Sequence, residues 1–475
     1  MAGIRIKRQA ATPRGVERRV KDAAFQEVSD ERCDLRTRFA MAPLLGLMVY
    51  GLASGAPSLR ALEVRSEQIR GAVRDELGLP NERVADNTLG RVLRQVSCFE
   101  LRGCLHRQVK AEVRRGRLGP ASSRDCLKLR TRRQVAAVDG KALSSLHLRE
   151  LLQVTRQVLK DAGDARTEDK EWNPSREDIK AVFVSRFPHV KLCHPDDGEM
   201  YGTVMVHRTT LVSSDAAVCI DQRPIAGKCN EVGEMPSTID ELFRVYGRTG
   251  LLDVVTSDAG NVSLKVANRI RHHGADYFLG LKENQPDLHR EAARTLEWAA
   301  DDDCTASKSE ERSGATVTYR CWTHPLPEGY LKWSHARQFL RVERTTIDND
   351  DKVVSHNRYF ITSMAPDALD GEDTLALARM HWRCENEGHW TSDVFLKEDA
   401  RRHHGSRHPN GIIARSYLAM IAQNILAVLR ALSRIGDALL RPRWADALAH
   451  VAAVLFDVRL NTKAFDDIED SAFPA

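Results

Sequence analysis

Three carboxylates, Asp139, Asp258 and Glu385, are placed in the sequence where they could act on one ligand. Asp139 follows the short apolar run 135–138 and Asp258 follows the run 252–256, so both are expected just past the ends of buried strands. In open α/β sheets, ligands bind at the carboxyl ends of the strands, where side chains from neighbouring strands converge. Glu385 lies in the later segment HWRCENEGHW, whose polar residues recur every four positions, as on one face of a helix. We therefore predict a carboxylate cluster built from two strand ends and one helix.

Such a cluster suits phosphoryl transfer assisted by two metal ions. Two Mg²⁺ ions about 3.5–4 Å apart take hard oxygen ligands, and water and phosphate complete their coordination. One ion would activate a water or a 3′-hydroxyl, and the other would stabilise the leaving oxygen. The ten cysteines include no C-x-x-C pair. Carboxylates without paired cysteines indicate Mg²⁺ or Mn²⁺ rather than zinc.

Other interpretations of the same residues remain open. Asp258 could cap the helix that follows it, and Asp139 could be a turn residue before a glycine. Segment 381–390 could be an amphipathic helix whose tryptophans, Trp382 and Trp390, pack inward while its polar face meets water. A zinc site is a further alternative, although its spacing matches no zinc pattern. Its ligands would be His381, Cys384, His389 and His403.

The elements that must position these residues follow from the hydrophobic pattern. Residues 252–281 show a strand, a helix at about 262–272 and a second strand at 277–281, a βαβ unit whose two strands are parallel neighbours. Segments 203–214 and 217–225 predict two strands of a hairpin or meander. Residues 147–195 are polar and largely helical with a loop-like centre, and residues 316–364 contain three β-rich runs.

The order of these elements, together with the length of 475 residues, predicts an α/β chain in five parts. They are a basic arm (1–34), a helical N-terminal domain with a charged connector (35–133), an α/β region that carries Asp139 and Asp258 (134–290), a β-rich region (291–372), and a helical C-terminal region that carries Glu385 (373–475).

Basic residues cluster although the formal net charge is only +5. Residues 5–21 carry seven basic side chains against Glu17, and residues 110–133 carry nine against Glu112 and Asp125. A third group, RRHHGSRH, spans residues 401–408. Each run could be a solvated face or linker, but three of them favour binding of a polyanion such as DNA.

The chain is expected to be cytosolic, with free thiols. No secretory signal precedes the cysteines, and they show no paired spacing. The apolar stretch 40–56 contains Pro43 and falls short of the ~20 residues that a membrane span needs, so we predict a buried helix and no membrane partner.

Several segments together resemble one protein family. AVDGKAL (137–143), GKCNEVGEMP (227–236), VTSDAGN (255–261), YFLGLKENQPDL (277–288), RYFITSM (358–364) and HWRCENEGHWTSDVFLKEDARR (381–402) occur in this order. The order is similar to that of bacterial insertion-sequence DDE transposases, in the group containing the H-repeat-associated transposases. The resemblance covers residues 35–430, and its last segment is the most specific because it matches over a whole helix and beyond.

The resemblance implies an RNase H-like mixed sheet with flanking helices, a β-rich insertion before the last catalytic helix, and a helical N-terminal region. Asp139, Asp258 and Glu385 would be the catalytic, metal-binding acids. The implied activity is metal-dependent DNA cleavage at transposon ends and strand transfer into target DNA. A nuclease without strand transfer and an inactive, DNA-binding descendant of a transposase are the alternatives.

The implied partners are transposon-end and target DNA, with a possible homodimer in the synaptic complex, in the bacterial cytoplasm near the nucleoid. The residues expected to contact DNA come from the charged connector, the loop after the strand at 277–281, and the last motif. They are Arg114, Arg115, Arg117, Arg130, Arg132, Arg133, Lys282, Asn284, Gln285, His389, Arg401 and Arg402.

Overall fold

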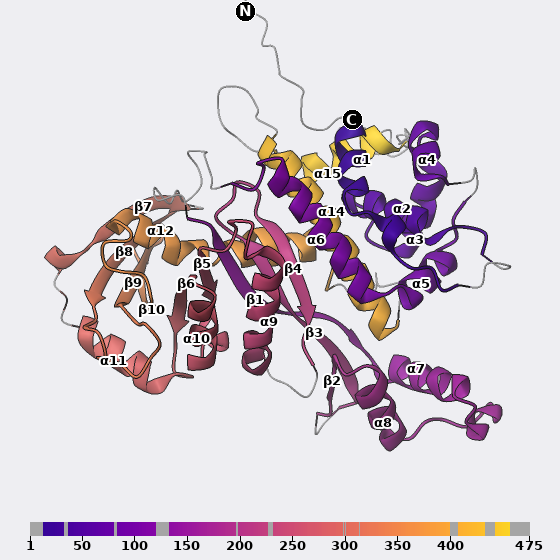
Figure 1. Cartoon of the computed structure of the whole chain (residues 1–475), viewed down its shortest axis with the longest axis horizontal. Helices are drawn as coiled ribbons and strands as arrows, with labels where there is room; N and C mark the ends of the chain where they lie inside the picture. Colours follow the sequence, from indigo (N-terminus) through magenta and orange to yellow (C-terminus); the bar gives the residue numbers. More distant parts are fainter. Residues whose placement is uncertain are drawn as a thin grey trace, which may run out of the picture.

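The computed structural model shows a central sheet between a helical region and a β-rich extension (Figure 1). The structure describes residues 13–32, 37–79, 83–119, 133–195, 198–226, 231–297, 299, 301–312, 314–399, 407–432 and 442–456.

The sheet has the predicted RNase H-like order. Its central strands run β4-β3-β1-β5-β6, with antiparallel pairing among the first three and parallel pairing of β1 with β5 and of β5 with β6. The bounds are β1 (Val135–Leu146), β3 (Tyr201–Leu211), β4 (Val218–Pro224), β5 (Val254–Ser257) and β6 (Asp276–Leu281). The predicted βαβ unit and the adjacency of the two aspartate-bearing strands are therefore confirmed.

The insertion continues this sheet. β10 pairs antiparallel with β6, and β9, β8 and β7 follow in order to the edge. The bounds of these elements are α11 (Pro286–Leu296), η5 (Asp301–Asp303), β7 (Ala306–Arg312), β8 (Ala315–Pro325), β9 (Gln338–Ile347) and β10 (Val353–Thr362). The three β-rich runs of the sequence are β8, β9 and β10, and β7 is an additional edge strand.

Helices cover both faces of the sheet. One face packs against α9 (Glu231–Tyr246) and α10 (Leu264–His272), which contribute Met235 and Ile270 to a core that also contains Val255. Over part of the other face lie α12 (Gly371–Met380) and η6 (Cys384–His389), followed by α13 (Trp390–Val394). η4 (Ala259–Asn261) links β5 to α10.

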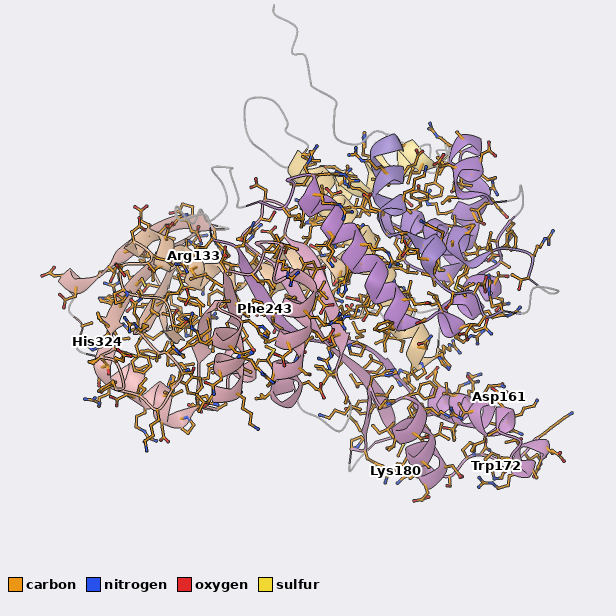
Figure 2. All side chains as sticks on the ribbon, in the orientation of Figure 1. Arg133, Asp161, Trp172, Lys180, Phe243 and His324 are labelled. Carbon is orange, nitrogen blue, oxygen red and sulfur yellow. The ribbon has the colours of Figure 1, made fainter. Side chains whose placement is uncertain are left out.

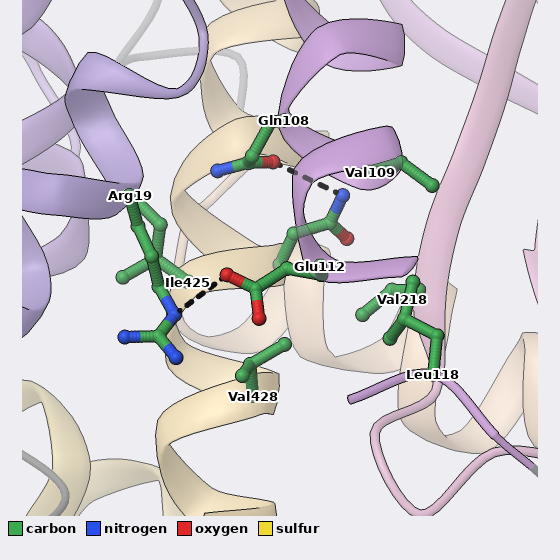
Figure 3. Close-up of a pocket in the computed structure, with 9 residues that line it drawn as sticks. Arg19, Gln108, Val109, Glu112, Leu118, Val218, Ile425 and Val428 are labelled. Atoms are coloured by element: carbon green, nitrogen blue, oxygen red, sulfur yellow. Dashed lines mark hydrogen bonds and ion pairs between the residues drawn. The ribbon is translucent and has the colours of Figure 1, made fainter. Parts of the chain in front are cut away.

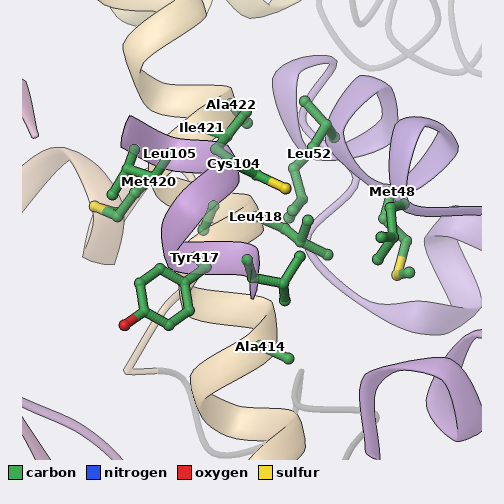
Figure 4. Packing of buried hydrophobic residues seen from close by; sticks show 14 of the residues in the cluster. Met48, Leu52, Cys104, Leu105, Ala414, Tyr417, Leu418, Met420, Ile421 and Ala422 are labelled. Atoms are coloured by element: carbon green, nitrogen blue, oxygen red, sulfur yellow. The ribbon is translucent and has the colours of Figure 1, made fainter. Parts of the chain in front are cut away.

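The N-terminal helices pack around a C-terminal helix. α14 (Pro409–Leu432) contacts α2, α5 and α6, and Figure 4 shows Leu52 of α2 and Leu105 of α6 in the same core as Leu418. The bounds are α2 (Met41–Ala53), α3 (Leu59–Gln68), α4 (Gly71–Leu77), α5 (Asp86–Gln95), α6 (Cys98–Arg114) and α15 (Trp444–Leu455).

Two apolar helices of this region, α2 and α14, are buried almost completely inside the protein. α2, which covers most of the apolar stretch 40–56, is the buried helix predicted there. Within the described ranges, α14 alone is long and apolar enough to cross a membrane, and its most apolar stretch is wholly buried inside the protein. Length and apolar composition alone do not distinguish a membrane-spanning helix from a helix buried in a protein core.

Part of the expected basic arm is packed against the protein. α1 (Pro13–Lys21) buries Val16 and Val20, which lie one turn apart, and η1 (Phe25–Glu27) follows it. Arg19 forms a buried ion pair with Glu112 at 3.1 Å beside a small cavity (Figure 3). The described part of the predicted basic arm is therefore attached to the protein, because one face of α1 is apolar and one of its arginines has a buried partner. Residues 1–12 lie outside the described residues.

A helical unit projects from the sheet between β1 and β3. It consists of α7 (Leu148–Asp161), η3 (Ala165–Glu168), α8 (Arg176–Arg186) and β2 (Val190–Cys193), which pairs with β3. Figure 2 labels Asp161, Trp172 and Lys180 on this unit, away from the insertion. The helical character predicted for residues 147–195 is confirmed.

Candidate active site

Asp139 and Asp258 lie side by side on neighbouring parallel strands. The register pairs Val138 of β1 with Ser257 of β5, and each aspartate is the next residue along. Side chains alternate between the faces of a strand, so Asp139 shares a face with Ala137, and Asp258 shares a face with Val254. Ala137 and Val254 belong to the core cluster beneath α12 and η6. Both carboxylates therefore point to the face that these helices cover.

β1 does not end at Asp139, contrary to the prediction of a turn. The strand continues to Leu146 because β3 pairs with it across this point, with Asp139 opposite Arg208 and Gly140 opposite His207. Asp139 therefore lies inside a strand, where its Oδ1 accepts a hydrogen bond from the Gly140 amide at 2.9 Å.

Asp258 does not cap the following helix with its side chain. Its Oδ1 accepts a hydrogen bond from Nδ2 of Asn261 at 3.0 Å, and it makes no side-chain capping bond. Ser263 caps α10 instead, accepting from the Val266 amide at 3.3 Å. The capping role considered for Asp258 is therefore filled by another residue.

Glu385 lies on a π-helical turn that contacts β1 and β3. The amide of Trp390 donates to the Glu385 carbonyl, five residues back, which is the hydrogen bond that defines a π-helix. Partial burial raises the pKa of the Glu385 carboxyl, and the negative charge of Asp258 adds to the rise, whereas Arg358 and Lys282 oppose it. Glu385 thus lies within electrostatic reach of Asp258 and of two cations.

Three polar contacts attach the segment after Glu385 to the strands that carry the site. Nδ1 of His389 lies 3.4 Å from Oδ2 of Asp139. Lys141 lies two residues after Asp139 on β1, and its Nζ donates to both carboxylate oxygens of Asp393 at 2.7 Å.

The third contact is the buried ion pair between Arg208 and Glu398, 2.9 Å apart. Arg208 is the cross-strand neighbour of Asp139, so this pair fastens the end of the segment to β3. Glu398 also accepts from Oγ of Ser416 at 2.5 Å, which ties the pair to α14. The three contacts together hold the turn that carries Glu385 over the β1–β3 pair.

Of the two histidines that flank Glu385, His381 is buried and His389 is partly buried, and both are neutral, so neither belongs to a solvated face. Burial lowers the pKa of His381 to about 4, and its Nδ1 lies 3.5 Å from Oγ1 of Thr256. Burial, with the nearby charges of Arg208 and Lys141, lowers the pKa of His389 to about 3. The two imidazoles have different partners, and His403 of the alternative zinc site lies outside the described residues.

The tryptophans of this segment differ from each other. Trp382 is partly buried, and the guanidinium of Arg358 lies 4.0 Å from the centre of its ring. Trp390 is 52% exposed and contacts Phe395 edge-on. Inward packing, the alternative considered for both, does not hold for Trp390.

Donor chemistry decides whether a divalent ion fits this site. No three His, Cys, Asp or Glu side chains in the described part of the chain are grouped closely enough to hold a metal ion. Mg²⁺ keeps several waters and is commonly bound through one or two carboxylates plus substrate phosphates. The adjacent carboxylates of Asp139 and Asp258, with Glu385 on the covering turn, fit that mode of binding.

The residues expected to contact DNA have diverse surroundings. Arg114 and Arg117 are exposed. Arg115 is paired with Asp22 at 2.5 Å, and Arg133, labelled in Figure 2, with Asp276 at 2.7 Å. The remaining arginines of that prediction, Arg130, Arg132, Arg401 and Arg402, lie outside the described residues.

The residues of the loop after β6 have two different roles. Asn284 donates to the Ala259 carbonyl at 2.5 Å and Gln285 to the Val262 carbonyl at 3.0 Å, so both fasten this loop to the one that follows Asp258. Lys282 is exposed, and its positive charge acts on Glu385.

Sequence reasoning missed Lys141, Arg208, Glu398 and Arg358. A signal existed for three of them, because Lys141, Arg358 and Glu398 stand inside the segments that carry the family resemblance. Arg208 offered none, since it lies outside those segments and an arginine within a strand gives no indication of its partner.

Comparison with known proteins identifies the family. The model of the family described as "Transposase DDE domain" matches residues 188–425, slightly more than half of the chain. The chain belongs to this family. Asp258 and Glu385 lie within the matched range, and Asp139 precedes it.

Two curated relatives from Escherichia coli agree with this assignment. The chain is 25% identical over 245 residues to "Putative transposase YncI" of the O157:H7 serotype, covering 49% of this chain. It is 24% identical over 231 residues to "H repeat-associated putative transposase YhhI" of strain K12, covering 46% of this chain. The matched regions span 58% of the length of each relative.

Proposed function

We propose that this protein is a DNA transposase that cuts DNA strands at the ends of a mobile element and joins the freed 3′-hydroxyl to target DNA. The observation that carries the proposal is the placement of Asp139 and Asp258 side by side beneath the turn that bears Glu385. Membership in the DDE transposase family supports it.

In this proposal Asp139, Asp258 and Glu385 hold Mg²⁺ or Mn²⁺. Ions held there would supply activation of the attacking water or 3′-hydroxyl and stabilisation of the leaving oxygen. His389 contacts Asp139 and keeps its carboxylate oriented, as residues around metal ligands commonly do. Because the imidazole is neutral at physiological pH, it adds no positive charge that would compete with a cation.

The proposed substrate is DNA on the bacterial chromosome, bound by two copies of the chain at the two element ends. Lys282, whose charge acts on Glu385, is a candidate for a contact with a phosphate near the reacting one. Exposed Arg114 and Arg117 at the end of α6 are candidates for contacts farther along the duplex.

The test is cleavage of a supercoiled plasmid carrying the element ends, with Mg²⁺ and with excess chelator. Asp139→Asn, Asp258→Asn and Glu385→Gln each remove one negative charge with little change of shape. Each is expected to abolish cleavage and joining while retaining DNA binding in a gel shift, because ligand charge is needed for the ions but not for the fold.

Asp287→Asn, at an exposed aspartate on α11, is the matched control and should cut like the wild type. Full cleavage by any one of the three site variants would remove that residue from the proposed site. Cleavage without a joined product from the wild type would identify a nuclease instead.

A further inference from the structure

A second charged feature lies beside the carboxylates. β6 and β10 pair antiparallel with Leu281 opposite Tyr359, so the next pair along this register is Lys282 opposite Arg358. Lys282 lies four residues after Phe278, and Arg358 lies two residues before Phe360, so each cation shares a face of the sheet with its phenylalanine. Both phenylalanines belong to the core beneath α12. Lys282 and Arg358 therefore point to the same face of the sheet as the carboxylates.

Arg344 extends this feature along the insertion. On β9 it pairs with His356, and Val342, two residues earlier, pairs with Arg358. Diagonal neighbours of this kind lie about 7–8 Å apart on one face. Arg344 and Arg358 are close enough that their charges act on each other.

Four arginines on β8, β9 and β10 differ in what they contact on the two faces of these strands. On the opposite face, Arg320 pairs with Glu343 at 2.7 Å, and Arg341 donates to the Leu296 carbonyl at 2.8 Å. On the face of the carboxylates, Arg344 and Arg358 have no ion pair within 4.0 Å to any carboxylate among the described residues. Their charge is thus left available to a ligand.

Arg358 is also held in place. Its guanidinium lies over the Trp382 ring at 4.0 Å, and Trp382 stands three residues before Glu385. Stacking on an aromatic face fixes the plane of a guanidinium while leaving its N–H groups free to donate. A guanidinium presented in this way matches the non-bridging oxygens of a phosphodiester.

We propose that Lys282, Arg358 and Arg344 form a phosphate-binding track that receives the DNA backbone next to the carboxylates and leads it onto the insertion sheet. This inference rests on the proposed function, since it takes DNA as the ligand. The insertion would then bind the DNA directly, through Arg344 on β9 and Arg358 on β10.

The test is the salt dependence of DNA binding, measured by fluorescence anisotropy with a labelled 30-base-pair duplex in the absence of divalent metal. Each lost phosphate contact lowers the slope of log K against log salt by about 0.9. Arg344→Gln with Arg358→Gln should therefore lower the slope by about 1.8, equivalent to about 60-fold weaker binding at 0.1 M salt.

Lys352→Gln is the matched control, because Lys352 is an exposed lysine at the tip of the same β9–β10 hairpin. It should keep the wild-type slope and affinity. If Arg358→Gln disturbs the packing of Trp382 and lowers the yield of folded protein, the pair Lys282→Gln and Arg344→Gln makes the same prediction without touching the stack.

An unchanged slope in the double variants, with wild-type plasmid cleavage, would overturn the track and leave the proposed function standing. Wild-type protein that binds the duplex with the predicted dependence on these residues but never cuts would instead overturn the proposed function alone. Equal losses in Lys352→Gln and in the double variants would show a general effect of charge and would also overturn the track.

Discussion

Replacing Glu398 by glutamine tests whether the buried pair with Arg208 holds the site together. Arg208 and Glu398 are 1% and 2% exposed, and three hydrogen bonds of 2.9–3.1 Å join them. Burial would raise the pKa of Glu398, but the charges of Arg208 and Lys141 outweigh it and hold the pKa well below its usual range. Glu398→Gln keeps the side-chain size and leaves Arg208 as a buried, uncompensated cation.

Breaking a buried ion pair on one side costs about 3–5 kcal/mol, because the remaining charge stays desolvated. We expect Glu398→Gln to lower the free energy of unfolding by this amount in urea, followed by circular dichroism. Arg208→Met combined with Glu398→Leu should recover most of the loss, since neither charge then remains buried. Asp287→Asn, which breaks an exposed pair with Arg290, should change the free energy by less than about 1 kcal/mol.

A loss from Glu398→Gln no larger than that of Asp287→Asn would refute this reasoning. It would mean that water or a rearranged side chain compensates Arg208 after the change. A double variant as unstable as the single one would refute it differently, by showing that shape and hydrogen bonds, not charge, dominate at this position.

Three further predictions concern other parts of the chain. His389→Leu should reduce plasmid cleavage about 10–100-fold, whereas His389→Asn, which can still donate toward Asp139, should retain more activity at each Mg²⁺ concentration. Burial lowers the pKa of His408 to about 4, so at this residue only the unfolded chain takes up a proton as pH falls from 6.5 to 4. His408 should therefore contribute up to about 3 kcal/mol to the loss of stability in that window, and urea titrations at several pH values should show a correspondingly smaller loss in His408→Gln. Gly371→Ala would place a Cβ 2.2 Å from the backbone oxygen of Thr305, so it should destabilise the protein by about 1–3 kcal/mol in thermal melts, and a wild-type melting temperature would contradict that contact.

The strands that show a hydrophobic pattern were predictable from the sequence, and one strand without such a pattern was not. β5 and β6 are apolar runs separated by a helix, and their parallel pairing follows from the handedness of the crossover. β7 has the sequence ASKSEER and no buried residue, so only its pairing with β8 makes it a strand. Charged residues on an edge strand also prevent further pairing, which explains why the usual signal is absent.

The carboxylates of the site could be predicted from the sequence, but the contacts that position them could not. Asp139 and Asp258 were found because each follows an apolar run, although the Asp139-Gly140 pair suggested a turn that long-range pairing with β3 overrides. The contacts of Lys141 and Arg208 join residues about 190 to 250 positions apart, and local patterns carry no information on such pairs.

The position of α14 has a consequence for the order in which the chain can fold during synthesis. α2 ends at Ala53 and α14 ends at Leu432, 379 residues later (432 − 53). At about 5–20 residues per second, the ribosome needs roughly 20–75 s to cover that distance. For that time the apolar surface of α2 lacks the helix that covers it. We therefore expect the nascent N-terminal region to need chaperones, and a chain truncated before α14 to be prone to aggregate.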